Sequence, residues 1–189
     1  MHGVGQSLLL EELLGDWGAA SRLQQRVEDA VAANIATPCV LNERTLLVCA
    51  LAHAYLGDEE EASRLEQEAG AHRMTGYGPL QDAPRVQLAL HRNDLAAVES
   101  LLGEPGVRRA TTYYLSSMAT HLDGLAALGE RDRVETEAGR LLQPNTYLEP
   151  FALRALGVVR EDAGMVERAA GRFETLGLDW HAARTRALL

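Results

Sequence analysis

The chain has 189 residues and a formal net charge of −9, and all 18 of its basic residues are arginine. The absence of lysine excludes Schiff-base and P-loop chemistry, which need an amine. The acidic balance argues against a nucleic-acid-binding surface. Hydrophobic residues make up 47% of the chain, which supports a folded core, and strong helix formers dominate the composition.

Five turn motifs divide the chain. Each consists of an apolar helix end, a breaker that tolerates left-handed backbone, and an acidic or polar helix start. The intervals between successive breakers are 42, 36, 36 and 35 residues, the length of a two-helix unit. We therefore expect about five antiparallel helical hairpins. The breakers are Gly15, Gly57, Asn93, Gly129 and Gly164.

Helical spacing of apolar residues predicts the individual elements in chain order. The expected helices span residues 6–14, 17–33, 42–56, 58–74, 82–91, 94–102, 109–128, 130–142, 149–162, 165–176 and 179–188. Turn residues separate them at 37–38, 76–79, 103–106 and 144–145. No long linker or shift in composition interrupts this pattern, so we expect a single all-α domain over residues 1–189. The short first helix suggests an incomplete hairpin, and hence a fragment of a larger signalling protein.

These repeats resemble the tetratricopeptide family, which carries small residues where paired helices cross. Ala50 and Gly157 match the small position of the first helix, whereas Val86 and Leu122 do not. The stretch 169–183 is similar to the end of the repeat region in bacterial signalling regulators of the ATPase/adenylate-cyclase or LuxR type. The resemblance implies a right-handed superhelix, a TPR-like α-solenoid. No Walker motif is present, so ATPase activity is not implied.

Few residues of the chain suggest catalysis or metal binding. Cys49 and His53 lie four residues apart, the spacing of half a metal site, but no second half accompanies them and Cys39 lies beyond a proline. A buried structural thiol is the favoured interpretation of Cys49. His121 and Asp123 face different sides of their predicted helix. We therefore expect no enzyme activity, no metal and no cofactor.

Aromatic residues have two interpretations. Adjacent Tyr113 and Tyr114 point about 100° apart on a helix, so we expect one in the core and one at the surface. Core packing and use as an interface anchor both stay open. Trp17 and Trp180 begin helices after breaks, and we expect each to pack one hairpin against the next.

A curved stack of hairpins presents a groove that is lined by the first helix of each hairpin. Such a groove is suited to a peptide or a partner domain. We therefore interpret the chain as a protein-interaction scaffold or sensor module. Alanine substitutions at Arg44, Tyr55 and Arg154 are expected to weaken partner capture without changing the thermal melt. Counting from the breakers gives the predicted partner-binding residues Arg44, Tyr55, Gln87, His91, Asp123, Arg154 and Glu161.

An alternative function is a small-molecule effector-sensing domain of a bacterial signalling or transcriptional regulator. An enzyme with a site assembled from scattered residues is a third hypothesis. We expect no nucleic-acid or membrane partner, since no segment has the length of a membrane span. The expected location is therefore cytoplasmic. Self-association through exposed solenoid ends stays open.

Overall fold

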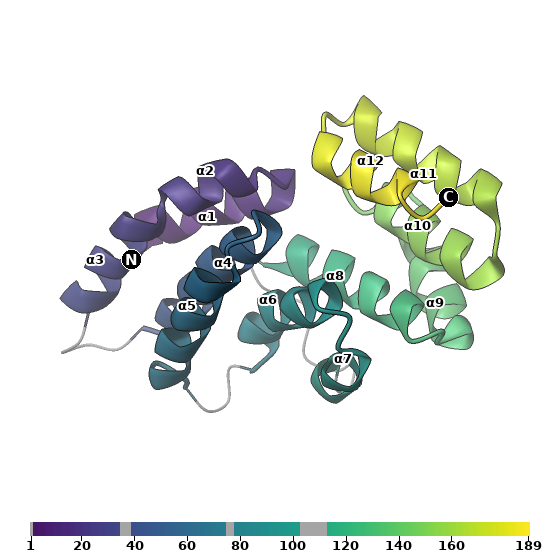
Figure 1. Ribbon diagram of the computed structural model, residues 1–189. Helices are drawn as coiled ribbons and strands as arrows, with labels where there is room; N and C mark the ends of the chain where they lie inside the picture. The colour runs from purple at the N-terminus through teal and green to yellow at the C-terminus, as the bar shows by residue number, and fades with distance from the viewer. Residues whose placement is uncertain (1, 35–38, 75–77, 103–112) are drawn as a thin grey trace. The chain divides into compact units, whose positions relative to one another are not determined.

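The structure is a computed structural model that describes residues 2–34, 39–74, 78–102 and 113–189. All regular secondary structure in these residues is helical, which confirms the predicted all-α class. The chain divides into two compact units, Met1–Arg92 and Asn93–Leu189, and Figure 1 shows the helices of each.

The first unit is built around one central helix. Helix α4 packs against α1, α2, α3, α5 and α6, and residues 41–52 along it are all buried. A helix that is covered on nearly every side needs apolar residues all round, and the sequence supplies them. The helices are α1 (His2–Leu14), α2 (Trp17–Arg22), α3 (Gln24–Ala33), α4 (Leu41–Tyr55), α5 (Glu59–Ala71) and α6 (Gly78–His91).

The second unit has a comparable centre in α10, which packs against α8, α9 and α11, while α12 packs on α11. Phe151 and Phe173 join α10 to α11 in an edge-to-face pair with ring centroids 4.8 Å apart. The described helices are α7 (Leu95–Leu102), α8 (Tyr114–Ala127), α9 (Arg131–Ala138), the 3-10 helix η2 (Gly139–Leu141), α10 (Glu149–Arg160), α11 (Ala163–Thr175) and α12 (Asp179–Arg186).

The hairpin turns share one hydrogen-bond pattern. At Gly57, the backbone N–H bonds to the carbonyl of Ala54, and the next N–H, of Asp58, bonds to the carbonyl of His53. This is the Schellman arrangement, which needs a left-handed residue at its centre. The same pair of bonds recurs around residues 15, 129, 161 and 177, each with a positive φ between 55° and 74°.

Aspartate follows the left-handed residue in four of the turns and caps the next helix. Its side chain accepts a hydrogen bond from the backbone N–H three residues later, which satisfies one of the unpaired donors at a helix start. These aspartates are Asp16, Asp58, Asp94 and Asp162. The predicted breaker-and-cap motif is therefore confirmed at Gly15, Gly57 and Asn93.

The prediction of Gly164 as the last breaker is wrong. The left-handed residue is Glu161, with φ 55°, and Gly164 lies inside α11. Helix α10 consequently ends at Arg160, and the interval from Gly129 is 32 residues rather than 35. The sequence pattern indicated position 164 because glycine is the usual residue at a left-handed turn position. Glutamate is disfavoured in that conformation.

Other predicted boundaries need smaller corrections. The helix predicted over 17–33 is two helices, α2 and α3, separated at Leu23. Helix α6 begins at Gly78, four residues before its predicted start. The predicted turns at 37–38 and 103–106, residues 76–77 and residues 109–112 of the predicted helix 109–128 lie outside the described residues.

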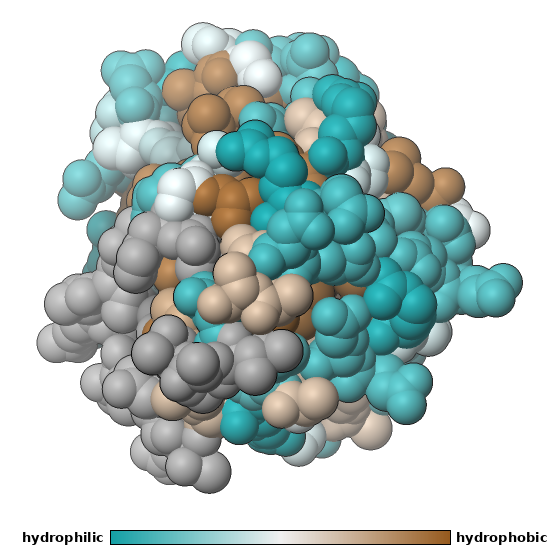
Figure 2. Space-filling view, turned by 90° about the vertical axis from the view of Figure 1, so that its left-hand side faces the viewer, coloured by the Kyte–Doolittle hydropathy of each residue, from teal (hydrophilic) through white to brown (hydrophobic). Residues whose placement is uncertain are grey.

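Among the described residues, no helix is both long and apolar enough to cross a membrane. Figure 2 shows hydrophilic residues over much of one face, with hydrophobic ones in small groups between them. Leu10 and Leu14 lie one turn apart on α1 and are 54% and 40% exposed. They are the kind of apolar surface on which the expectation of self-association rests.

Gly157 and Gly171 provide a matched test of the α10–α11 packing. A Cβ on Gly157 would lie 2.8 Å from Val166 Cγ2 and 3.0 Å from the Val166 backbone nitrogen, whereas one on Gly171 would meet nothing within 4 Å. We expect Gly157→Ala to lower the free energy of unfolding by about 1–3 kcal/mol through overpacking. Gly171→Ala should raise it by about 0.5–1 kcal/mol through helix propensity. Urea unfolding measures both, and equal effects would contradict the close approach.

Candidate functional site

The seven predicted partner-binding residues fall into two groups, one in each unit. Arg44, Tyr55, Gln87 and His91 belong to the first unit, on α4 and α6. Asp123, Arg154 and Glu161 belong to the second, on α8, on α10 and at the end of α10. Within each group the structure distinguishes residues that lie at the surface from residues that are held in the interior.

Tyr55 and His91 come together at the ends of α4 and α6, each of which is the first helix of its predicted hairpin. They occupy equivalent places, two residues before the left-handed residues Gly57 and Asn93. Because α4 and α6 pack side by side, their rings meet edge to face with centroids 4.9 Å apart. Gln87 lies one turn before His91 on α6 and therefore on the same side of that helix. The structure thus brings three of the four residues together.

Trp17 extends this contact to the first hairpin. Its ring lies 4.8 Å from that of Tyr55, centroid to centroid, and only 4% of the residue is exposed. The predicted packing of Trp17 between hairpins is therefore confirmed, since it begins α2 and contacts α4. Tyr55 is half-buried, whereas His91 is exposed, so the row of rings opens to solvent at its His91 end.

Charged side chains border the exposed end of this row. His91 Nε2 lies 3.5 Å from Glu59 Oε1, and Arg92 donates hydrogen bonds to Glu59 and Glu66 over 2.9 and 2.7 Å. The hydrogen bond to Glu66, followed by the one to Glu59, raises the pKa of Arg92. We call the surface formed by Tyr55, Gln87 and His91 the α4–α6 face. It combines half-buried apolar area with polar groups at its border, as protein-binding surfaces do.

Arg44 is not part of that face. It is 2% exposed, and its guanidinium donates to Glu12 on α1, which is itself 3% exposed. Arg154 is 4% exposed and donates two hydrogen bonds of 2.6 and 2.8 Å to Asp123 on α8. It also donates to Thr185 on α12 over 3.1 Å. Both arginines therefore connect helices inside their own unit.

A third ion pair of the same kind joins α4 to α6. Arg85 donates to Glu43, whose side chain is 0% exposed. An arginine–carboxylate pair thus joins first helices in α1–α4, α4–α6 and α8–α10 alike. Sequence reasoning missed this role, although the charged run Glu43–Arg44 inside an apolar helix could have signalled it.

Cys49 and His53, the possible half of a metal site, have structural environments of their own: His53 is hydrogen-bonded and Cys49 is buried. His53 Nε2 lies 2.6 Å from Gln24 Oε1, and its Nδ1 lies 3.3 Å from Asp58 Oδ2. Burial, and to a smaller extent the charge of Glu28, raises the pKa of the Cys49 thiol to about 12. The described residues contain no group of three or more His, Cys, Asp or Glu side chains placed to hold a metal ion.

His121 and Asp123 lie on α8 and pair with different helices. His121 Nε2 lies 2.9 Å from Glu137 on α9, whereas Asp123 pairs with Arg154, so the two side chains do face different ways. Tyr113 is 6% exposed and Tyr114 is half-buried, which confirms a core position for the first of the pair.

Comparison of the chain with protein-family models, with curated proteins and with solved structures finds no match.

Burial of Arg44 and Arg154 changes the expected result of replacing them. Removing one member of a buried ion pair leaves an uncompensated charge, so Arg44→Ala should lower the free energy of unfolding by about 3–5 kcal/mol. Arg64→Ala is the control in the same unit, because Arg64 is 45% exposed and its loss should cost about 1 kcal/mol or less. Urea unfolding compares them. A cost for Arg44→Ala no larger than that for Arg64→Ala would show that the Arg44–Glu12 pair is not buried in solution.

The two cysteines should differ in reactivity. The Cys49 thiol is buried and stays protonated far above neutral pH, while Cys39 is half-buried. Since the thiolate is the reactive species, a thiol reagent at about pH 8 should modify Cys39 first and Cys49 only on unfolding. Peptide mass spectrometry after timed labelling distinguishes them, and early labelling of Cys49 would contradict the buried position.

Proposed function

We propose that this chain is a protein-interaction module whose partner, a peptide or a partner domain, binds across the first helices of its hairpins. The observation that carries the proposal is the α4–α6 face. Residues about 36 positions apart, Tyr55 and His91, occupy equivalent places on successive first helices and are in contact. A surface assembled from equivalent positions of stacked hairpins is the usual binding surface of helical-repeat proteins.

The internal ion pairs support the same proposal. Arg44–Glu12 and Arg85–Glu43 tie α4 to the first helices on either side of it. Ion pairs and hydrogen bonds of this kind hold neighbouring helices in one register, so the α4–α6 face is formed before a partner arrives. A preformed surface loses less conformational entropy on binding than a surface that must be ordered.

The proposal predicts that a double substitution on the α4–α6 face weakens partner capture. Gln87→Ala combined with His91→Ala removes two side chains from this face without touching the buried ion pairs. The residues that dominate an interface cost about 1 kcal/mol or more when truncated, so if the pair includes one of them affinity should fall roughly tenfold or further. A tagged chain is used to capture partners from native lysate, and the affinity of the purified partner is then measured for each variant.

The matched control is Gln67→Ala combined with His72→Ala, which removes the same residue types from α5 and its C-cap in the same unit. This control should capture the partner normally. Equal loss in both double variants, or loss in neither, would contradict the assignment of the α4–α6 face. A folded chain that captures no protein would instead favour the effector-sensing alternative, which a metabolite-dependent rise in melting temperature tests.

A further inference from the structure

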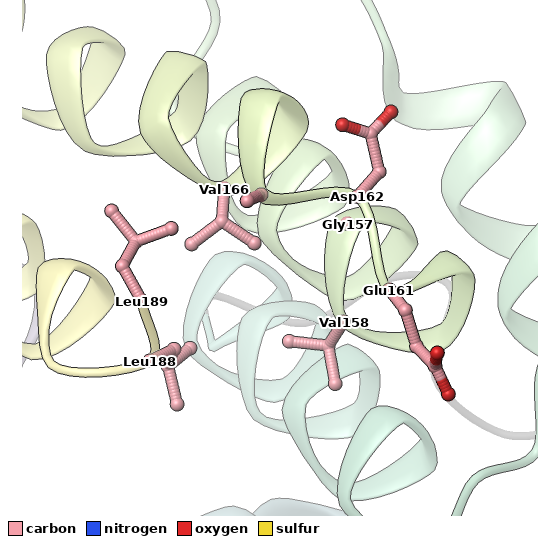
Figure 3. A pocket seen from close by; sticks show the side chains of 8 residues that line it. Gly157, Val158, Glu161, Asp162, Val166, Leu188 and Leu189 are labelled. Atoms are coloured by element: carbon pink, nitrogen blue, oxygen red, sulfur yellow. The ribbon is translucent and has the colours of Figure 1, made fainter.

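A hollow of about 340 Å³ lies in the second unit, where the α10–α11 turn meets the residues that follow α12. Its apolar wall consists of Val158 and Val166 together with Leu188 and Leu189, which are 55% and 60% exposed. Figure 3 shows these four side chains around the hollow, with Glu161 and Asp162 on the side opposite the leucines and their carboxylates pointing away from it in opposite directions. The hollow is therefore apolar inside and acidic on one side.

The backbone at Glu161 is unusual for its residue type. In the equivalent turns the left-handed position holds Gly15, Gly57, Asn93 and Gly129, which adopt this conformation readily. Glu161 has φ 55° and ψ 35° there, although a side chain with a Cβ is disfavoured in that region. Glycine would stabilise this turn, so glutamate at position 161 lowers its stability. Strained residues of this kind are concentrated at functional sites.

The charges around the hollow are negative. Among the described residues, the Glu161 carboxylate has no hydrogen bond or ion pair, while Asp162 uses one oxygen to cap α11. Gly157 to Arg160 form the last turn of α10, whose carbonyl groups add partial negative charge at the same edge. The neighbouring Arg160 is engaged by Glu135, and the Arg168 guanidinium borders Gly164 next to the Asp162 carboxylate, so Glu161 is the acidic group that is left for a cation. This edge is therefore complementary to a positive group.

We propose that the hollow is a docking site for a partner-protein segment that inserts one apolar side chain and places an arginine or lysine against Glu161. The proposal rests on the proposed function in taking the partner to be a protein, but it concerns residues separate from the α4–α6 face. The apolar side chain gains from contact with Val158 and the exposed leucines. The cationic group gains from the Glu161 carboxylate and the end of α10.

A designed helical peptide tests this chemistry directly. The probe is a fluorescein-labelled peptide with a leucine and an arginine one helical turn apart on an alanine–glutamine background, and its binding to the full chain is followed by fluorescence anisotropy. One comparison peptide replaces the arginine with glutamate, and another replaces the leucine with glutamine. The leucine–arginine peptide should bind most tightly. The proposal is overturned if it does not bind, or if the glutamate peptide binds equally well.

Substitution at Glu161 separates binding from a structural role. Glu161→Gly relieves the strained backbone, so the midpoint of urea unfolding should rise while affinity for the leucine–arginine peptide falls roughly fivefold. Glu161→Gln should weaken the peptide similarly without the gain in stability. Glu167→Gln, which removes an exposed charge from α11, should leave binding unchanged. Unchanged affinity in Glu161→Gly would overturn the proposal.

Two further measurements identify the occupant. If the chain self-associates in sedimentation velocity and Glu161→Gly abolishes this, the occupant is a second copy and the proposal of a partner segment is wrong. The Gln87→Ala, His91→Ala variant should bind the leucine–arginine peptide normally. Its loss of captured partner with retained peptide binding would support both proposals, whereas loss of peptide binding alone in Glu161→Gly would support only this one.

Discussion

Close approach of the two helices within a hairpin is the constraint on which both units depend. In the first unit, Ala50 on α4 and Ala62 and Ala69 on α5 are all 0% exposed. In the second, the backbone of Gly157 approaches Val166 so closely that no side chain fits between α10 and α11. Small residues at these places let the two helices interlock, and within each unit first helices also pack on one another, α4 on α6 and α8 on α10.

Buried ion pairs constrain how neighbouring first helices lie against one another. Each pair of neighbouring first helices named above, α1–α4, α4–α6 and α8–α10, is joined by an arginine and a carboxylate with at least one member buried. Such pairs add little net stability compared with apolar residues of similar size, but they penalise a slipped register, in which a buried charge loses its partner. Because the chain has no lysine, every such cation is a guanidinium, whose planar fork suits carboxylates.

The sequence predicted most of the helices because helix propensity, apolar spacing and turn chemistry agree along most of the chain. Gly57–Asp58 is the clearest case, since a left-handed glycine and an aspartate cap both carry local signals. The sequence could not predict the left-handed backbone of Glu161, because glutamate disfavours that conformation. It also could not predict the ion-pair partners of Arg44 and Arg154. Counting along a helix gives the direction of a side chain, but an acid 32 residues away, as Glu12 is from Arg44, is brought close only by packing.

Under the proposed function, the distinction between interior and surface charge decides which of the predicted residues are available to a partner. Arg44 and Arg154 have their hydrogen bonds satisfied inside their units, so bringing them to a partner would break an existing pair. His91, by contrast, is exposed, and its 3.5 Å contact with Glu59 lies at the surface, where an ion pair contributes little. Glu161 differs from both groups, since it is exposed and its backbone is strained. Glycine adopts this conformation without that strain, and it holds the left-handed position at Gly15, Gly57, Gly129 and Gly177.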